Sequence, residues 1–522
     1  MARVLMVQGT MSNAGKSLLV AGLCRLYARR GYRVAPFKSQ NMALNSYVTG
    51  EGLEIGRAQA MQAQACGIAP SVDMNPILLK PTGDMKSQVI VRGRPLANMR
   101  ARDYFRCKKS LIPQIMESYE RLAAEHDIIL VEGAGSPAEI NLREDDIVNM
   151  GLAKILDAPV LLVGDIDPGG VFAQLYGTWA LLPEEEQERI RAFIINKFRG
   201  DQSLLDPGIR MLEERVGIPV LGVLPYMDLL IDDEDSLSIR LKDGEAGEID
   251  IAVVRLPHMS NASDFTVFEG REGVSLRFIR SPDRLLSADL VILPGTKNTL
   301  ADLNWLRKAG FFEPLRKRAE EGGLMAGICG GYQILGRSVL DPERVEGGGS
   351  APGLGLLPQV TVMGRDKILT RVRGHFADDF TGPWSCLRNQ PLEGYEIHQG
   401  QTQTESLVES KGLQSPGGRE DLSWPRQLGR LRLDAGADWE EKGGSFMEGM
   451  VTGSVLGTYI HGVFDGKGVA EAVLNSIAGR RGLPLRYELR EAGAFAEEQY
   501  DRLADAIEEH MDMERIDAIL GL

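Results

Sequence analysis

Short apolar runs that end in glycine or polar residues recur along this chain, separated by segments with helical spacing. In the first half these runs are residues 4–7, 33–37, 127–131, 159–164, 192–195 and 220–223. Short apolar strands connected by helices form a parallel sheet that is covered on both faces. Such sheets bind ligands in the crevice at the carboxyl ends of their strands. The pattern therefore predicts an α/β fold and places candidate functional residues directly after the strands.

The length of the chain predicts more than one hydrophobic core. It has 522 residues, of which 43% are hydrophobic and 25% charged, an ordinary globular composition. The formal net charge of −14 provides no basic field for phosphates, which argues against a nucleic-acid partner. Five scattered cysteines without CxxC spacing fit reduced thiols better than a disulfide framework or a zinc site. With neither a signal peptide nor an apolar run of about 18 residues, we expect a cytoplasmic protein without a membrane partner.

The first strand leads into a glycine-rich loop, residues 9–17, which is followed by a segment with helical spacing. A loop between a strand and a helix N-terminus presents backbone N–H groups to phosphates. Lys16 would neutralise the β/γ oxygens, and Ser17 would help to hold Mg²⁺. The first glycine is Gly9, one place earlier than the strict pattern requires, and Thr10 stands in its place. The expected nucleotide contacts of the loop are Ser12, Asn13, Ala14, Gly15, Lys16 and Ser17.

Polar side chains follow three of the later strands in this half. Glu132 is the carboxylate expected to hold the metal, directly or through water, with a solvated loop acid as the alternative. Asp165 and Asp167 are either a further metal or substrate site or helix N-caps. Asn196 is expected to present its amide edge to adenine, although asparagine at a strand end is also common in turns.

These motifs resemble the dethiobiotin synthetase-like ATPases. The resemblance rests on residues 9–17, including the displaced first glycine, on Glu-Gly-Ala-Gly at 132–135 and on Asn-Lys at 196–197. It implies ATP and Mg²⁺ as cofactors and an acyl phosphate that an amine then attacks. The chemistry is sensible, because phosphorylation gives a carboxylate a leaving group while Mg²⁺ and lysine absorb the charge.

A second site is indicated in the other half, where residues 324–333 read Leu-Met-Ala-Gly-Ile-Cys-Gly-Gly-Tyr-Gln. An apolar run followed by Gly-x-Cys-x-Gly is typical of a nucleophile elbow, which lifts one side chain above the sheet. A helix N-terminus also favours the thiolate form of Cys329. The alternative is a small cysteine packed in a glycine-rich turn.

A cysteine nucleophile needs a base, and His461 is the candidate because it follows a β-prone apolar strand at 455–460. His398, in the segment Gly-Tyr-Glu-Ile-His at 394–398, is its rival. The pair of Cys329 and His461 resembles class I, triad-type glutamine amidotransferase domains. That resemblance implies that the cysteine attacks the side-chain amide of L-glutamine, that the histidine transfers protons and that ammonia leaves.

The same resemblance implies an oxyanion hole formed by Gly295 and Gly330. The chain departs from the family pattern at one position. Triad members usually carry glutamate two residues after the histidine, whereas this chain has Val463. Either another group orients His461 or the site works as a dyad.

An amide-forming ATPase fused to such an amidotransferase resembles the cobyric acid synthase family over nearly the whole chain. Further matching segments are residues 38–42, 54–59, 163–167 and 394–398. The resemblance implies a corrinoid substrate, adenosylcobyrinic acid a,c-diamide, amidated at its b, d, e and g carboxylates to give adenosylcobyric acid. One alternative is the related a,c-diamide synthase. Another is a non-enzymatic P-loop nucleotide switch, although such proteins usually carry a second lysine early in the loop.

We expect two doubly wound α/β domains, an N-terminal P-loop parallel sheet and a C-terminal class I glutamine amidotransferase-like sheet. The synthetase domain is assigned to residues 1–230, a linker to 231–248 and the amidotransferase domain to 249–475, with a polar insertion at 405–449. Residues 476–522 are predicted to form a helical C-terminal tail that docks on the core or makes a dimer contact. The oligomeric state is left open.

Overall fold

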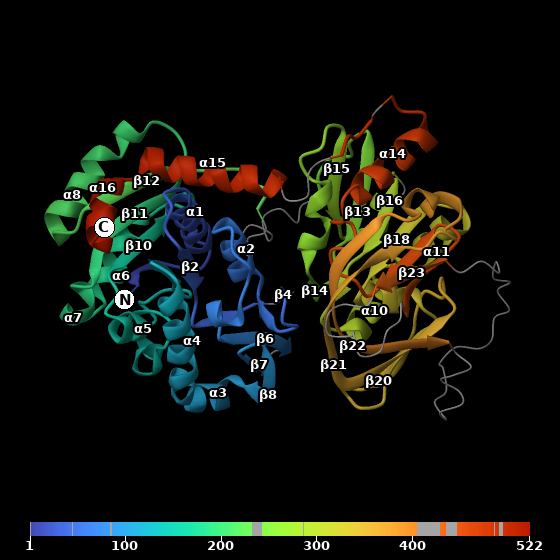
Figure 1. The fold of residues 1–522 in the computed structure, drawn as a ribbon, viewed down its shortest axis with the longest axis horizontal. Helices are drawn as coiled ribbons and strands as arrows, with labels where there is room; N and C mark the ends of the chain where they lie inside the picture. The colour runs from blue at the N-terminus through green and yellow to red at the C-terminus, as the bar shows by residue number, and fades with distance from the viewer. Residues whose placement is uncertain are drawn as a thin grey trace. The chain divides into compact units, whose positions relative to one another are not determined.

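The computed structural model describes residues 2–43, 45–83, 86–231, 243–285, 287–404, 429–434, 446–484, 486–489 and 494–522. The chain divides into two units. Unit 1 comprises Met1–Ser238 together with Phe495–Leu522, and unit 2 comprises Ile239–Ala494. Each unit contains its own large sheet with helices packed against it (Figure 1). The predicted α/β class, with parallel strands in both units and helices at the C-terminus, is confirmed.

Six parallel strands form the main sheet of unit 1, in the order β12-β11-β10-β1-β9-β2. Their bounds are β1 Arg3–Gly9, β2 Val34–Phe37, β9 Ile128–Glu132, β10 Val160–Asp165, β11 Ile190–Phe198 and β12 Val220–Pro225. Neighbouring residues of β1 pack on opposite faces, since Leu5 and Val7 belong to one core and Met6 to the other. Burial on both faces explains why these strands are continuously apolar.

Two layers of helices cover this sheet. The first core is covered by α1 (Lys16–Arg29), α2 (Arg57–Ala65), α15 (Ala494–His510) and α16 (Met513–Leu520). The second is covered by α4 (Ile112–Glu125), α5 (Met150–Leu156), α6 (Val171–Ala180) and α8 (Asp206–Val216). A smaller sheet combines β3 (Gln40–Met42), β6 (Ile77–Gly83), β7 (Lys86–Val91) and β8 (Arg94–Arg100). Within the described residues, no helix is both long enough and apolar enough to span a bilayer.

The C-terminal helices pack on α1 (Figure 1). Gly22 allows the close approach, because a Cβ there would lie 2.3 Å from Cδ1 of Ile507. Arg25 pairs with Asp501 at 2.8 Å at the edge of this contact. Exposed ion pairs contribute little to stability, so the apolar contact dominates. Of the two arrangements expected for the tail, this chain adopts docking on the core.

Unit 2 contains a mixed sheet in the order β15-β13-β16-β18-β25-β24-β23-β21-β19-β20, with β22 paired to β21. The parallel part consists of β13 (Ile249–Val254), β15 (Val274–Ile279), β16 (Leu290–Leu293), β18 (Leu324–Ile328) and β25 (Val455–Thr458). The remaining strands are β19 (Ser338–Asp341), β20 (Gly349–Pro352), β21 (Gln359–Phe376), β22 (Pro391–Thr404), β23 (Gly429–Asp434) and β24 (Phe446–Thr452). Its helices include α10 (Thr299–Lys308), α11 (Phe312–Glu320), α12 (Gly330–Leu335) and α14 (Val469–Arg481).

Part of the expected polar insertion at 405–449 belongs to this sheet. β23 pairs antiparallel with both β21 and β24, and β24 continues the ladder to β25. The alternation Arg-Leu-Arg-Leu at 430–433 is a strand pattern, which the neighbouring glycine and proline residues obscured. Residues 405–428 and 435–445, like 232–242 of the expected linker, lie outside the described part of the chain.

Candidate active sites

Cys329 occupies the sharp turn between β18 and α12, with backbone angles φ 52° and ψ −108°. A positive φ is strained for a residue with a Cβ, so the surrounding packing must hold the turn. A Cβ on Gly331 would lie 1.9 Å from the carbonyl oxygen of Leu293, and one on Gly330 would lie 2.5 Å from Cγ2 of Thr296. Both positions therefore require glycine. The strand, turn and helix of the expected elbow are all present.

His461 follows β25, the strand that lies beside β18 in the sheet. Its imidazole lies close enough to the sulfur of Cys329 for the two groups to interact electrostatically. The same sulfur lies 3.7 Å from the carbonyl oxygen of Ile397, and the ring of Tyr395 stacks on the imidazole with centroids 5.2 Å apart. The structure thus brings the expected nucleophile and base into contact.

The rival histidine has other partners. The ring of His398 stacks on that of Tyr459, with centroids 3.6 Å apart, and its Nδ1 lies 2.7 Å from the carbonyl oxygen of Gly400. Burial lowers the pKa of His398 to about 4. An imidazole with so low a pKa is a poor base at neutral pH, which favours His461.

Asp264 provides the carboxylate that position 463 lacks. Its Oδ2 lies 2.6 Å from Nδ1 of His461, and its Oδ1 accepts the backbone N–H of Gly462 at 3.2 Å. Asp264 belongs to the 3-10 helix η5 (Ala262–Phe268), 197 residues before the histidine in the chain. The sequence does not reveal this residue, because the family pattern places the third member two residues after the histidine and Asp264 is far from that position. Val463 is a fully buried core residue instead.

The charges around His461 favour its protonated form. Burial lowers the pKa of His461, but the carboxylate of Asp264 and the sulfur of Cys329 raise it more strongly, to about 9. At neutral pH the ring therefore carries both protons, one directed to the carboxylate and one to the sulfur. An imidazolium beside a sulfur stabilises the thiolate, which is the nucleophilic form of cysteine.

The residues of the expected oxyanion hole lie beside this pair. Gly295 belongs to the short strand β17 (Gly295–Thr296), and a Cβ there would lie 3.1 Å from Cε1 of His461. A Cβ on Gly330 would lie 2.9 Å from the backbone nitrogen of Thr296, so the two glycine segments are in contact. Backbone N–H groups of these two segments can therefore lie near the carbonyl oxygen of a ligand bound at the sulfur.

In unit 1 the expected phosphate loop connects β1 to α1. Gly15 precedes the helix with φ 96°, and a Cβ there would lie 2.0 Å from Nδ2 of Asn196. That amide nitrogen donates to the carbonyl oxygen of Ala14 at 2.9 Å, so Asn196 supports the loop. Adenine recognition by Asn196 stays a prediction. Ser12 and Asn13 are exposed at the tip of the loop.

Glu132 accepts hydrogen bonds from the phosphate loop and from two other segments of unit 1. Oε1 of Glu132 accepts the hydroxyl of Ser17 at 2.9 Å and the ammonium of Lys38 at 2.7 Å, while Oε2 accepts Nε2 of Gln62 at 2.6 Å. Burial raises the pKa of Glu132, but Lys38 and Gln62 lower it further, so the net shift is downward and the group is a carboxylate. Nζ of Lys16 donates to two backbone carbonyls, at 3.0 and 3.2 Å.

The two aspartates after β10 form ion pairs. Asp165 pairs with Lys197 at 2.7 Å, and its Oδ1 accepts the backbone N–H of Asp167 at 2.9 Å. Asp167 pairs with Arg199 at 3.2 Å. Lys197 also donates to the carbonyl oxygen of Asn13 at 2.6 Å, which ties this strand end to the phosphate loop. Within the described residues, no group of three or more His, Cys, Asp or Glu side chains forms a metal cluster.

Two family models match the chain, one for each unit. A CobQ/CobB/MinD/ParA nucleotide binding domain matches residues 5–238, and a CobB/CobQ-like glutamine amidotransferase domain matches residues 250–469. The chain is therefore a glutamine-dependent ligase that joins a P-loop nucleotide-binding unit to an amidotransferase unit. A solved crystal structure of a glutamine amidotransferase aligns with 45% of this chain and 99% of its own, at 15% identity and a TM-score of 0.28.

Full-length relatives identify the family. The cobyric acid synthase of Lachnoclostridium phytofermentans is 48% identical and covers 100% of this chain and 99% of its own. That of Ruminiclostridium cellulolyticum is 49% identical over 99% of this chain and 96% of its own. The cobyric acid synthase of Sorangium cellulosum is 49% identical over 100% of this chain and 99% of its own. The chain belongs to the cobyric acid synthase family.

Proposed function

We propose that this chain catalyses glutamine-dependent, ATP-driven amidation in cobalamin biosynthesis. Its substrate is the corrinoid adenosylcobyrinic acid a,c-diamide, whose b, d, e and g carboxylates become amides to give adenosylcobyric acid. The observation that carries the proposal is the similarity to cobyric acid synthases along the whole chain. The reaction takes place in the cytoplasm and involves neither nucleic acid nor a membrane.

The domain division follows from the two chemistries. We assign ATP-dependent activation to residues 1–230 and glutamine hydrolysis to residues 249–475, with 231–248 as the linker between them. The family models, which match residues 5–238 and 250–469, support this assignment. The helices after residue 494 serve the first domain, because they complete its core.

In the amidotransferase unit, Cys329 is the nucleophile. Its sulfur attacks the side-chain amide carbon of glutamine, and backbone N–H groups of Gly295 and Gly330 bind the resulting oxyanion. The imidazolium of His461 gives its proton to the leaving nitrogen, which departs as ammonia. The neutral ring then takes a proton from water, whose attack on the thioester releases glutamate. Asp264 holds the ring in position and stabilises its positive charge.

In the synthetase unit, a substrate carboxylate attacks the γ-phosphorus of ATP. The backbone of the phosphate loop and the ammonium of Lys16 stabilise the charge that spreads over the phosphoryl oxygens. The product of this step is an acyl phosphate, and ammonia attacks its carbonyl carbon. Phosphate then leaves and the amide remains, so each turnover consumes one ATP and one glutamine.

Ser17 and Glu132 fit the requirements of a Mg²⁺ site. Magnesium in nucleotide sites prefers hard oxygen ligands and uses one or two carboxylates together with substrate phosphates. The hydroxyl of Ser17 and the ionised carboxylate of Glu132 are 2.9 Å apart at the start of α1. When bound, Mg²⁺ would neutralise negative charge on the phosphates.

Replacing Asp264 with asparagine is expected to slow glutamine hydrolysis by about 100- to 10,000-fold, because the imidazolium loses its counter-charge and its orientation. Without that carboxylate only the sulfur of Cys329 opposes the effect of burial, so the pKa of His461 falls from about 9. The alkaline limit of the activity must therefore move to lower pH. Steady-state glutaminase rates measured from pH 5 to 10 test this expectation.

Asp264→Glu is the matched variant, because it keeps the negative charge on a side chain that is one methylene longer. It should recover part of the rate of glutamine hydrolysis and move the alkaline limit of the activity back toward that of the wild type. Amidation driven by free ammonia should be unchanged in both variants. An unshifted pH profile in a folded Asp264→Asn protein would show that the carboxylate has only a structural role.

Product analysis tests the proposed reaction. The protein is incubated with glutamine labelled with nitrogen-15 at the amide, ATP, Mg²⁺ and the a,c-diamide, and the corrinoid is examined by mass spectrometry. Incorporation of four labelled nitrogens supports the proposal. If the chain instead adds two to cobyrinic acid and none to the diamide, it is the a,c-diamide synthase. If no ammonia is released from glutamine under any condition, the nucleotide-switch alternative is favoured.

A further inference from the structure

A pocket of about 240 Å³ opens in unit 1 beside the phosphate loop. Residues of β3, α3 (Ala101–Cys107), the loop after β9 and the 3-10 helix η3 (Ile140–Asp145) line it. Gly135 is part of its wall, and the carbonyl oxygen of Gly135 accepts Nζ of Lys16 at 3.2 Å. A molecule in this pocket is therefore next to the lysine that we assign to phosphoryl transfer.

The acidic side chains around this pocket already have partners. The carboxylate of Asp146 accepts the backbone N–H groups of Val148, Asn149 and Gly151 at 2.8 to 2.9 Å. Glu186 pairs with Arg143 at 3.3 Å and with Lys154 at 3.2 Å. Glu139, which also lines the pocket, is exposed to solvent. Asp146 is thus held by backbone amides, Glu186 by arginine and lysine, and Glu139 faces solvent.

Lys108 differs from its charged neighbours. Its side chain lines the pocket, the residue is only 7% exposed, and its ammonium lies 4.2 Å from the ring centroid of Phe105. In the described part of the chain this ammonium donates no hydrogen bond and forms no ion pair. Burial lowers the pKa of Lys108, and the nearby carboxylates of Asp146 and Asp145 oppose this shift without contacting the ammonium. The adjacent Lys109, in contrast, is exposed and pairs with Asp145 at 2.9 Å.

An ammonium that contacts no protein carboxylate is stabilised further when a ligand supplies negative charge. We propose that Lys108 binds a carboxylate of the corrinoid substrate and so makes this pocket the acceptor site of the ligase. This inference rests on the proposed function, since it requires an acidic corrinoid as substrate. Each such carboxylate can form a charge-assisted hydrogen bond with the ammonium.

The apolar residues of the pocket suit the rest of the ligand. Met42 and Leu142 line it and are 61% and 41% exposed, and Phe105, whose ring contacts Lys108, also lines it. Large exposed apolar side chains grouped at a pocket indicate a binding surface. A corrin ring presents an apolar macrocycle edged with carboxylates and amides. Apolar walls with one buried cation match that combination.

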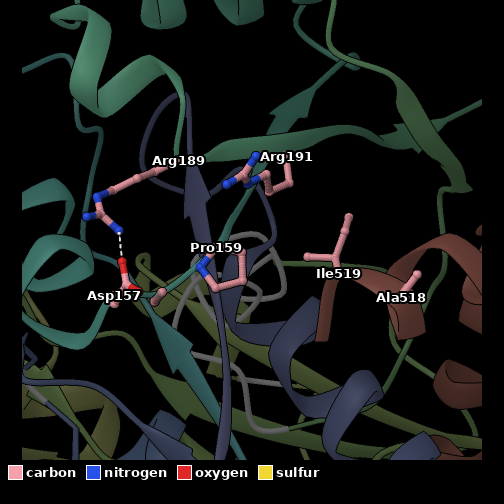
Figure 2. Close-up of a pocket in the computed structure, with 7 residues that line it drawn as sticks. Asp157, Pro159, Arg189, Arg191, Ala518 and Ile519 are labelled. Atoms are coloured by element: carbon pink, nitrogen blue, oxygen red, sulfur yellow. Dashed lines mark hydrogen bonds and ion pairs between the residues drawn. The ribbon is translucent and has the colours of Figure 1, made fainter. Parts of the chain in front are cut away.

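Another cavity of unit 1, of about 500 Å³, does not share these properties (Figure 2). Arg189 and Arg191 lie on its wall opposite Ala518 and Ile519, and Arg189 pairs with Asp157 at 2.9 Å. It lies at the amino ends of β10 and β11, whereas the phosphate loop lies at the carboxyl end of β1 in the same parallel sheet. A substrate bound there would be remote from Lys16.

The test compares Lys108→Met with Lys109→Met in the full-length protein, using free ammonia as the nitrogen source. Methionine preserves the length of the side chain and removes the charge. For Lys108→Met we expect the KM for the corrinoid to rise about 10- to 100-fold, which is the loss of one charge-assisted hydrogen bond. The KM for ATP and the rate of glutamine hydrolysis should not change. Lys109→Met, which removes an exposed charge, should match the wild type in all three quantities.

Binding of two ligands gives the second readout. Titration calorimetry with the acidic substrate and with its fully amidated product should show that the wild type prefers the acid and that Lys108→Met does not. An unchanged KM and an unchanged preference in Lys108→Met would overturn the assignment of this pocket. A wild-type protein that amidates no corrinoid would refute the proposed function itself, which is a different outcome.

Discussion

Replacing Cys329 with alanine is expected to abolish amidation driven by glutamine and to preserve amidation driven by free ammonia. The sulfur is the atom that attacks glutamine in this account, and no other described side chain in the elbow can form the thioester. Loss of a covalent nucleophile lowers rates by at least about a thousand-fold. The chemistry assigned to Lys16 and Glu132 does not involve the thiol. Rates of amide formation with each nitrogen source, measured in the same preparation, check the expectation.

Cys386→Ala provides the matched control. Cys386 lies in the 3-10 helix η7 (Gly382–Leu387) of the same unit, and its sulfur lies 3.7 Å from the carbonyl oxygen of Pro383. This variant should keep both activities. Continued use of glutamine by Cys329→Ala would contradict the assignment of the nucleophile. Failure of ammonia to support turnover in a Cys329→Ala protein with normal unfolding would contradict the division of labour between the units.

Replacing Lys16 with alanine is expected to remove both routes to the amide. Free ammonia cannot restore activity in this variant, because a carboxylate that has not been phosphorylated has no leaving group. Removing one preorganised cation from the charge that develops in the transition state costs at least about 100-fold in rate. Ammonia-driven amidation and release of phosphate from ATP are the measurements, and both should fall together.

The control for this variant is Lys154→Ala, on α5, which removes a surface cation paired with Glu185 and Glu186. It should retain both routes. Ammonia-driven turnover near the wild-type rate in Lys16→Ala would refute the phosphate-loop assignment. Equal loss in both variants would point to damage to the fold.

The parallel strands could be predicted from the sequence because they are buried on both faces and therefore apolar throughout. The loop before Lys16 and the turn at Cys329 could be predicted for a similar reason, since their geometry demands glycine at fixed places. The strands at 429–434 and 446–452 could not be predicted in this way, because the antiparallel strands of a mixed sheet need no continuous apolar run. These strands pair with strands that are distant in the sequence, and composition does not predict such pairing.

Prediction of the candidate sites from the sequence is limited in the same way. The roles of Lys16 and Ser17 can be predicted from the sequence, because both belong to one short loop with a characteristic spacing. The roles of Asp264 and Lys108 cannot be predicted in this way, because they depend on which side chains the fold places beside these two residues. Asp264 lies 2.6 Å from a ring that is 197 residues away, and Lys108 is notable as a largely buried residue whose ammonium contacts an aromatic ring and no carboxylate. Neither property is visible in the local sequence.

The central claim is that the carboxylate is activated by phosphorylation before ammonia attacks it. Its most direct test uses a corrinoid whose carboxylates carry oxygen-18, together with glutamine and ATP, and examines the phosphate that is released. Because an acyl phosphate breaks at the carbon–oxygen bond, one labelled oxygen should appear in phosphate for each amide formed. Phosphate without the label, alongside normal amide formation, would contradict the account.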